Sequence, residues 1–398
     1  MRKTLTSIIL ATAAMLLFSG TTARAQTFTT LYNFTGGPDG GGPHAGVIQD
    51  AAGNLYGNTF YGGDRKCAAG GCGVVFKMNS AGKETVVHTF SGRDDAWQPS
   101  IPLVRSKAGD LYGTAENGAY GAIFKIDTAG NEMLLYSFND GSGGCSPLQG
   151  LVWGESNTLV GTTEECGSSN YGTIFRVDSA GNLTVLHSFA GYPTDAGSPF
   201  YGHLTPDKLG NLYGVTVYGG SSKECTPEGC GALYKLSRNG TLTVLHSFAG
   251  GTSDGCYPMG SVVQDKAGNL YGTTNQCGSQ SGGIIWKVSK KGKEAVLHNF
   301  AGSPSDGVYP LAGVTRDSRG NLYGVTYDGG SGNNCGIGVG CGTLYRLSAT
   351  GRFTLLHSFD LNDGAYPLGE VLRTKRALFG TTKYGGKHYS GTVWKYTP

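Results

Sequence analysis

The sequence predicts an all-β protein that folds as a seven-bladed β-propeller with four-stranded blades. Three observations lead to this prediction: one unit recurs seven times, its period matches a propeller blade, and the two ends of the chain carry complementary parts of one blade. The period is seen at a phenylalanine that closes each unit and returns every 48 to 59 residues, at Phe34, Phe90, Phe138, Phe189, Phe248, Phe300 and Phe359.

Each unit carries four short strand patterns separated by glycine-containing turns. In the first copy they fall at residues 46–50, 53–57, 74–77 and 85–90. The third pattern holds an aromatic residue followed by Lys or Arg in all seven copies. Because side chains alternate across a strand, we expect the aromatic to be buried between blades and the base to face outward. These aromatics are Phe76, Phe124, Phe175, Tyr234, Trp286, Tyr345 and Trp394.

The ends of the chain fit one another. The first strand pattern, at residues 29–34, is a lone fourth strand, and the last, at residues 392–397, is a third strand. The last blade therefore lacks an outer strand, which the N-terminal segment supplies in our prediction. This pairing closes the ring and leaves no free sheet edge.

Residues 1–25 have the pattern of a secretory signal peptide. Arg2 and Lys3 precede an apolar run, and Ala23-Arg24-Ala25 forms a small-residue cleavage site. We expect cleavage after Ala25, a single propeller domain over residues 26–398, and a secreted protein, extracellular or periplasmic. The apolar run is too short and too interrupted for a membrane span, and none is expected elsewhere.

Charge balance excludes one class of partner. The segment 1–25 contains three of the 31 basic residues and no acidic one, so 28 basic residues face 28 acidic ones in the remaining chain. Nucleic-acid affinity depends on an excess of positive charge, so no nucleic-acid partner is expected. We expect a monomer.

Ten cysteines in a secreted chain favour disulfides. Three close pairs fall between the second and third strands of copies one, four and six, and two pairs separated by 21 residues join the loop before the first strand to the loop after the second. The predicted bridges are Cys67 with Cys72, Cys145 with Cys166, Cys225 with Cys230, Cys256 with Cys277, and Cys335 with Cys341. These spacings lack the C-x2-C pattern of zinc sites, so no metal site is assigned to them.

Two polar positions recur around the ring, which favours a structural role over a catalytic one. One is a histidine of the fourth strand, at His88, His187, His246, His298 and His357, with Tyr32 and Tyr136 in two copies. The other is an acid four residues before the blade proline, at Asp39, Asp95, Asp195, Asp254, Asp306 and Asp363, with Gly143 in the remaining copy. Asp-Gly suits a tight turn. No cofactor is predicted, and calcium at these carboxylates is the alternative.

Function is expected where the repeat varies, on the face that carries the long loops. Aromatic side chains there suit stacking on sugar rings or on a protein surface. The candidate ligand-binding residues are Trp97, Tyr61, Tyr218, Tyr327 and Tyr384, with His44, His203 and Glu370 near the central mouth, where they either line a pocket or cap the channel. The sequence shows no G-x-S-x-G, H-E-x-x-H or Walker motif, so no catalytic residue is named.

The repeated segments resemble a known family. Gly-Asn-Leu-Tyr-Gly-Thr-Thr (268–274), Gly-Thr-Val-Trp-Lys (391–395) and Val-Leu-His-Ser-Phe (185–189) are similar to the GloVer tandem repeat of exported bacterial proteins. The resemblance implies an extracellular or surface protein and carries over no activity. Members often have a C-terminal sorting anchor, whereas this sequence ends at Pro398 directly after a strand.

Three functions follow as hypotheses. The first is a binding or scaffold module for carbohydrate or an extracellular protein, acting through the long-loop face. The second is a carbohydrate-active or other hydrolytic enzyme with its site at the central channel mouth. The third is a structural component of the cell envelope.

Overall fold

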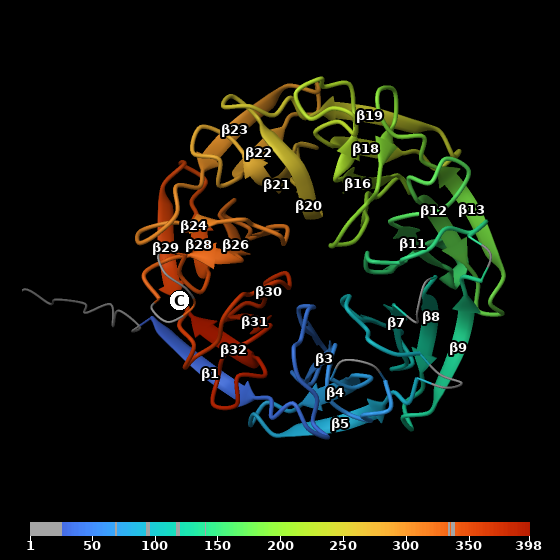
Figure 1. Ribbon diagram of the computed structural model, residues 1–398, viewed down its shortest axis with the longest axis vertical. Coiled ribbons are helices and arrows are strands. Elements are labelled where there is room, and N and C mark those ends of the chain that lie inside the picture. The colour runs from blue at the N-terminus through green and yellow to red at the C-terminus, as the bar shows by residue number, and fades with distance from the viewer. Residues whose placement is uncertain are drawn as a thin grey trace, which may run out of the picture.

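Seven four-stranded antiparallel sheets form a ring in the described part of the chain (Figure 1). The computed structural model describes residues 26–67, 70–92, 96–116, 120–139, 141–332, 335 and 339–398. Each sheet is one blade, with its first strand nearest the central axis and its fourth strand at the rim. The predicted seven-bladed β-propeller is therefore confirmed.

The strands of each blade follow one another along the chain, except in blade 7. Blade 1 contains β2 (Ile48–Gln49), β3 (Leu55–Thr59), β4 (Val74–Met78) and β5 (Glu84–Thr89), and blade 2 contains β6 (Val104–Arg105), β7 (Leu111–Ala115), β8 (Ala122–Ile126) and β9 (Glu132–Ser137). Blade 3 contains β10 (Val152–Trp153), β11 (Leu159–Thr163), β12 (Thr173–Val177) and β13 (Leu183–Ser188), and blade 4 contains β15 (Thr205–Pro206), β16 (Leu212–Thr216), β18 (Ala232–Leu236) and β19 (Leu242–Ser247). Blade 5 contains β20 (Gly255–Gln264), β21 (Leu270–Cys277), β22 (Ile284–Val288) and β23 (Glu294–Asn299), and blade 6 contains β25 (Thr315–Arg316), β26 (Leu322–Thr326), β28 (Thr343–Leu347) and β29 (Phe353–Ser358). Blade 7 contains β30 (Leu372–Arg373), β31 (Leu378–Thr382), β32 (Thr392–Thr397) and β1 (Thr27–Asn33).

Two short ribbons and one helical turn complete the described structure. The ribbons are β14 (Ala196–Gly197) with β17 (Tyr218–Gly219), and β24 (Gly307–Val308) with β27 (Asp328–Gly329). The turn is the 3-10 helix η1 (Glu155–Asn157). The first strand of blade 1 is shorter than the predicted 46–50, because the chain there leaves the sheet to meet blade 7. A Cβ atom at Gly46 would lie 2.4 Å from the Glu370 carbonyl oxygen.

The two ends of the chain close the ring, as predicted. Strand β1 pairs antiparallel with β32, from Thr27 opposite Thr397 to Asn33 opposite Thr392. The sheet order is β1-β32-β31-β30, so the N-terminal strand is the outer strand of blade 7 (Figure 1). Both ends are thereby held by a ladder of backbone hydrogen bonds.

The core lies between the blades and is built around the third-strand aromatics, which are buried as predicted. Phe76 is fully buried and packs edge-on against Phe34 of the preceding blade, with ring centroids 5.1 Å apart. Its register partner in β3 is Gly57, where a Cβ atom would lie 2.6 Å from the Phe76 ring. The glycine of the Leu-Tyr-Gly motif therefore makes room for the aromatic, whose burial contributes roughly 1.5–3 kcal/mol.

Side chains of the second strands also hydrogen-bond to the next blade near the axis. The Asn58 Nδ2 donates to the Ile101 carbonyl at 2.7 Å, and the Thr273 hydroxyl donates to the Ala312 carbonyl at 2.9 Å. At the ring closure, the Thr381 hydroxyl donates to the Ala45 carbonyl at 2.7 Å. These buried bonds fix one blade against its neighbour.

The repeated histidines and aspartates bind one another. His187 Nε2 lies 3.0 Å from Asp195 Oδ2, and the same carboxylate accepts the N–H groups of Ala190 and Ala196. The same His–Asp contact occurs at His246 with Asp254, His298 with Asp306, and His357 with Asp363. Tyr32 replaces the histidine and donates to Asp39 at 2.9 Å. These contacts stabilise the turn between blades, whereas Asp95 lies outside the described residues.

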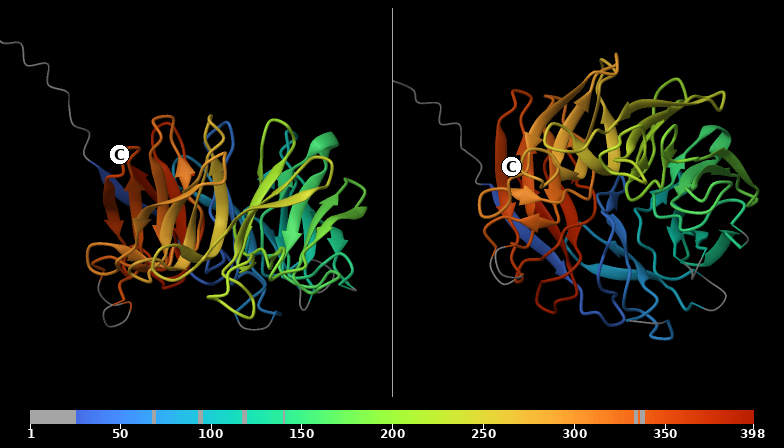
Figure 2. Two further views of the ribbon diagram at one scale, coloured as in Figure 1. Left: turned by 90° about the horizontal axis from the view of Figure 1, so that it is seen from above. Right: turned by 45° about the horizontal axis from the view of Figure 1, so that its top comes forward.

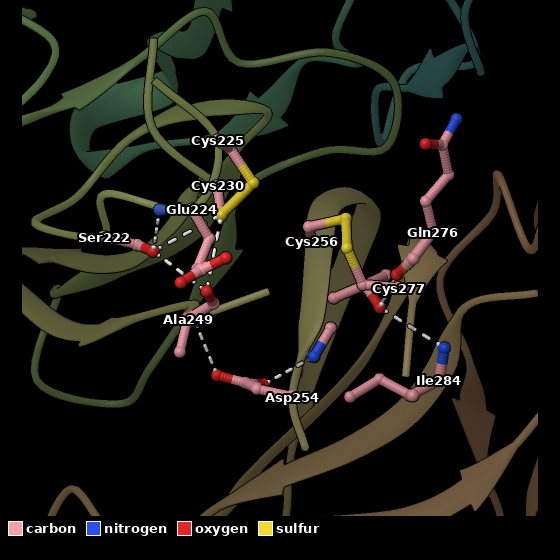
Figure 3. The surroundings of a disulfide bond; sticks show 12 residues. Ser222, Glu224, Cys225, Cys230, Ala249, Asp254, Cys256, Gln276, Cys277 and Ile284 are labelled. Atoms are coloured by element: carbon pink, nitrogen blue, oxygen red, sulfur yellow. Dashed lines mark hydrogen bonds between the residues drawn. A yellow bond between two sulfur atoms is a disulfide. The ribbon is translucent and has the colours of Figure 1, made fainter. Parts of the chain in front are cut away.

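The blades present two different faces, seen edge-on in Figure 2. We call the side with the loops that precede first strands and follow second strands the loop face, and the opposite side the turn face. All five predicted disulfides are present on the loop face, with Cα–Cα distances of 5.0 to 5.4 Å. Figure 3 shows the bridges of blades 4 and 5, with Asp254 binding the Ala249 N–H between them.

The predicted signal peptide, residues 1–25, lies outside the described residues, so it stays a prediction. Among the residues that the structure describes, no helix has the length and hydropathy needed to cross a bilayer.

Thr381→Val tests the hydrogen bond at the ring closure. Valine occupies the equivalent second-strand position in blades 4 and 6, at Val215 and Val325, so the substitution fits sterically. It leaves the Ala45 carbonyl without its partner, and we expect a loss of about 1–3 kcal/mol in the free energy of unfolding, measured in urea. Thr273→Val removes the equivalent bond within the ring and should lower the free energy of unfolding by a similar amount. A change below about 0.3 kcal/mol for both would contradict the role of these bonds.

Stability should pass through a maximum between about pH 4 and 5. Burial raises the pKa of Glu84 and Glu294 to about 7, so the folded state gains stability as pH falls from 8 and these groups take up protons. Burial would also raise the pKa of Asp317, but hydrogen bonds from the Asn321 side chain and backbone outweigh it and lower that pKa, and this contribution is lost as pH falls below about 4. Urea unfolding at pH 8, 5 and 3 measures the profile. Stability that rises steadily up to pH 8 would contradict it.

Candidate functional site

One position of the repeat varies more than its surroundings and surrounds the axis on the loop face. It directly follows the threonine or alanine that pairs with the start of each third strand. We call its residues the mouth ring: Phe60, Glu116, Glu164, Val217, Asn275, Tyr327 and Lys383. Backbone hydrogen bonds hold members of the mouth ring in the same way. The N–H group of Phe60 donates to the Gly42 carbonyl, and that of Glu164 donates to the Ser146 carbonyl.

A second layer lies just inside the mouth ring. His44 and Tyr201, which occupy equivalent positions in blades 1 and 4, border a cavity of about 20 Å³ that also touches Glu370. The His44 ring stacks on Phe60 with centroids 4.4 Å apart. This cavity is large enough for about one water molecule and too small for a sugar ring.

Two acids of the mouth ring share one electrostatic environment. The pKa of Glu164 is raised to about 7, first by burial and then by repulsion from Glu165 and Glu116. Burial raises the pKa of Glu116. Burial, followed by the charges of Glu116 and Glu164, raises the pKa of Tyr201 to about 12. The carboxyl groups of blades 2 and 3 thus lie near enough to Tyr201 to raise its pKa, and the pKa of Glu164 falls close to neutral pH.

The opposite side of the mouth carries a cation. Burial and then the Lys383 charge lower the pKa of His44 to about 3, so this imidazole is neutral at physiological pH. His44 Nε2 has no hydrogen-bond partner among the described residues. The Lys383 ammonium lies 5.2 Å from the centre of the Tyr384 ring.

Four tyrosines of blades 1, 6 and 7 form a tyrosine arc beside this cation: Tyr61, Tyr327, Tyr366 and Tyr384. Tyr327 stacks on Tyr366 with centroids 4.8 Å apart, and Tyr366 meets Tyr384 edge-on at 6.1 Å. The pKa of Tyr61 is raised by burial and by its contact with Tyr384. Tyr384 is 37% exposed, so the arc presents an aromatic surface to solvent.

Deeper in the channel, three blades meet through a serine, a histidine and a glutamate. Ser261 Oγ lies 2.6 Å from His203 Nδ1, and Glu370 Oε1 accepts the Ser261 N–H at 2.8 Å. Glu370 Oε2 lies 3.6 Å from the same His203 Nδ1. A catalytic triad needs serine and acid on different imidazole nitrogens, so this cluster joins blades 4, 5 and 7 without forming a triad.

Comparison with known proteins identifies the family. A profile of the Gloeobacter/Verrucomicrobia repeat matches residues 14–227 and again residues 223–398. The chain belongs to the Gloeobacter/Verrucomicrobia repeat family. The resemblance to the GloVer repeat drawn from the sequence is therefore confirmed. A search of curated proteins found no match.

Solved structures of other proteins are similar to this chain. Virginiamycin B lyase from Staphylococcus aureus is 14% identical, with a TM-score of 0.59, over 94% of this chain and 99% of that one. A catalytically inactive form of that lyase with Quinupristin is 15% identical, with a TM-score of 0.60, over 94% and 100%. A gluconolactonase from Xanthomonas campestris is 14% identical, with a TM-score of 0.46, over 77% and 88%. The likeness to the two lyase structures shows the fold alone.

The fold brings only some of the predicted ligand-binding residues together. His44, Tyr61, Tyr327 and Tyr384 lie at the mouth, and His203 and Glu370 lie below it. Trp97 is half-buried and packs on a hydrophobic cluster that includes Cys67 and Cys72. Tyr218 is half-buried and contacts Tyr257 edge-on, with centroids 6.2 Å apart.

Sequence reasoning missed Glu116, Glu164, Tyr201, Ser261 and Lys383. The available signal was variation at fixed positions of the repeat, since neighbouring positions keep their Thr, Gly and Pro while these change from blade to blade. Among the described residues, no group of three or more His, Cys, Asp or Glu side chains is arranged to hold a metal ion.

Glu164→Gln should stabilise the repeat protein at pH 8 and have little effect at pH 5. The buried carboxylate is charged at pH 8 and protonated at pH 5, whereas glutamine is neutral at both. We expect a gain of the order of 1 kcal/mol at pH 8, reduced by partial solvent screening. Urea unfolding measures it, with Glu224→Gln, at an exposed glutamate of blade 4, as the control. Equal effects of Glu164→Gln at both pH values would contradict the raised pKa.

Proposed function

We propose that the protein binds carbohydrate at the channel mouth on its loop face. The observation that carries this proposal is the tyrosine arc with its exposed Tyr384, placed around the same axis as Glu116 and Glu164. A sugar ring has an apolar face that stacks on aromatic rings and hydroxyl groups that bind carboxyl groups. The mouth offers both kinds of surface: the aromatic rings of the tyrosine arc and the carboxyl groups of the mouth ring.

The charges of the site favour a neutral ligand with many hydroxyl groups. Lys383 supplies only donors, and an ionised Glu116 supplies only acceptors. Glu164, with its pKa raised to about 7, supplies either according to its protonation state. Because both signs of charge are present at the mouth, neither an anionic nor a cationic ligand gains a clear electrostatic advantage.

We propose that the protein acts in an extracellular or periplasmic compartment. Five disulfides staple the loops that surround the mouth, and such bridges persist in oxidising surroundings. Carbohydrate or a glycosylated surface is available to a protein exported to that compartment.

The second candidate is a carbohydrate-active enzyme at the same mouth. It is favoured by one observation, the pKa of about 7 at Glu164, which suits a general acid near neutral pH. Glu116, on the neighbouring blade, would then be the second carboxyl group of the pair. The Ser261 cluster lacks the geometry of a hydrolase triad and supports no alternative there.

Binding to a glycan and polysaccharide panel tests the proposal, with product release followed in the same wells and with calcium present or absent. We expect saturable binding without products, weakened about fivefold or more by Tyr384→Ala through loss of the stacking surface. Tyr389→Ala is the control, because Tyr389 is 67% exposed and lies outside the tyrosine arc.

Each other outcome has a defined meaning. Product release that is lost in Glu164→Gln would establish the enzyme instead. Binding weakened equally by both tyrosine variants would place the ligand away from the mouth. Absence of both binding and product release across the whole panel would overturn carbohydrate binding. It would favour a protein partner or a structural role in the envelope.

A further inference from the structure

A tyrosine of the second strand fills the gap between blades on the turn face. In blade 1, Tyr56 lies between Lys77 of its own blade and Arg105 of the next, each 5.6 Å from the ring centre. In blade 5, Tyr271 lies in the same way between Lys287 and Arg316, each at 5.7 Å. Tyr112 of blade 2 meets Lys125 at 5.8 Å and the edge of Trp153 at 5.4 Å. The ring and its flanking groups narrow these junctions, and at the junction between blades 5 and 6 they leave a cavity of about 240 Å³.

The junction between blades 3 and 4 lacks this filling. Val160 replaces the tyrosine, and Pro206 replaces the large first-strand residue of the next blade. Val160 pairs with Arg176 as Tyr56 pairs with Lys77, so Arg176 has no ring beneath it. Arg176 is exposed, whereas the equivalent base in each of the other six blades is half-buried.

With these smaller side chains the cavity at this junction is about 370 Å³, compared with about 240 Å³ at the Tyr271 junction, and it lies within the range of small-molecule sites. Apolar side chains line it, namely Val160, Leu186, Leu212, Leu236 and the Trp153 indole. Trp153 is held in place by its Nε1, which donates to the Arg105 carbonyl at 3.3 Å.

The rim of this cavity carries an excess of positive charge. Glu155 is paired with Arg238 at 2.9 Å, and the Asp207 carboxylate accepts the N–H groups of Leu209 and Asn211. Arg176 and Lys208 line the same cavity, and neither forms an ion pair with the described residues. An anionic group at the rim would therefore find two cations that have no ion-pair partner among the described residues, beside the hydrogen-bonded Asp207 carboxylate.

We propose that this cavity, which we call the junction site, binds an aromatic carboxylate. The ring of the ligand occupies the space that a tyrosine fills at other junctions, against Val160 and Trp153. Its carboxylate binds the Arg176 guanidinium, whose planar fork suits two parallel hydrogen bonds, with Lys208 beside it. The site lies on the turn face, so it is separate from the channel mouth.

Equilibrium dialysis with 2-naphthoate tests the junction site. We expect saturable binding of one 2-naphthoate per chain. Val160→Tyr restores the ring of the other blades and should reduce affinity at least about tenfold, because ring and ligand compete for one space. Val185→Tyr is the matched control: it makes the same substitution in the same blade at a residue that is 38% exposed. It should bind as the wild type does.

A second variant tests the role of the charge. Arg176→Gln should weaken 2-naphthoate binding about tenfold, while Lys287→Gln, at the equivalent base of blade 5, should not. The uncharged 2-naphthalenemethanol should bind wild type and Arg176→Gln alike. Retention of 2-naphthoate by folded Val160→Tyr, equal binding by Arg176→Gln and wild type, or no binding by the wild type would each overturn the proposal.

Discussion

The pairing of β1 with β32 is the constraint on which the rest of the structure depends. Seven blades can surround an axis only if the last is joined to the first, and here the N-terminal strand makes that joint across the full length of β32. The Thr381 hydroxyl and the Ala45 carbonyl make a second joint nearer the axis. With the ring closed, the loops of blades 1, 2, 3, 6 and 7 are brought to one mouth, although their residues lie hundreds of positions apart.

Recurring and varying positions of the repeat have different roles within this ring. Positions that recur, such as the buried aromatic of the third strand opposite a glycine of the second, make each blade pack on the next. Both candidate sites occur where a recurring pattern is interrupted. The mouth ring takes different residues in successive blades, and the junction site is larger than the equivalent cavity of blade 5 where Val160 and Pro206 replace two large side chains.

The fold was predictable because its signals are local and repeated seven times. Strand order, ring closure and all five disulfides follow from spacing alone, and the turn aspartates were recognised from Asp-Gly segments. The site was only partly predictable. Glu116 and Glu164 carry no motif. Burial raises both pKa values, with repulsion from Glu165 and Glu116 added at Glu164, and the Glu116 contribution appears only once blades 2 and 3 are adjacent. Trp97 has the residue type of a binding aromatic, yet it packs beside a disulfide that the sequence does not place against it.

Hydrogen exchange of the backbone amides in β1 tests the closure of the ring most directly. If β1 is an integral strand of blade 7, its amides between Thr27 and Asn33 exchange only when the whole ring opens. Their protection should then match that of β13, an outer strand within one continuous blade, to within about tenfold. Exchange in β1 that is faster than in β13 by about a thousandfold would show a frayed terminus and contradict the account.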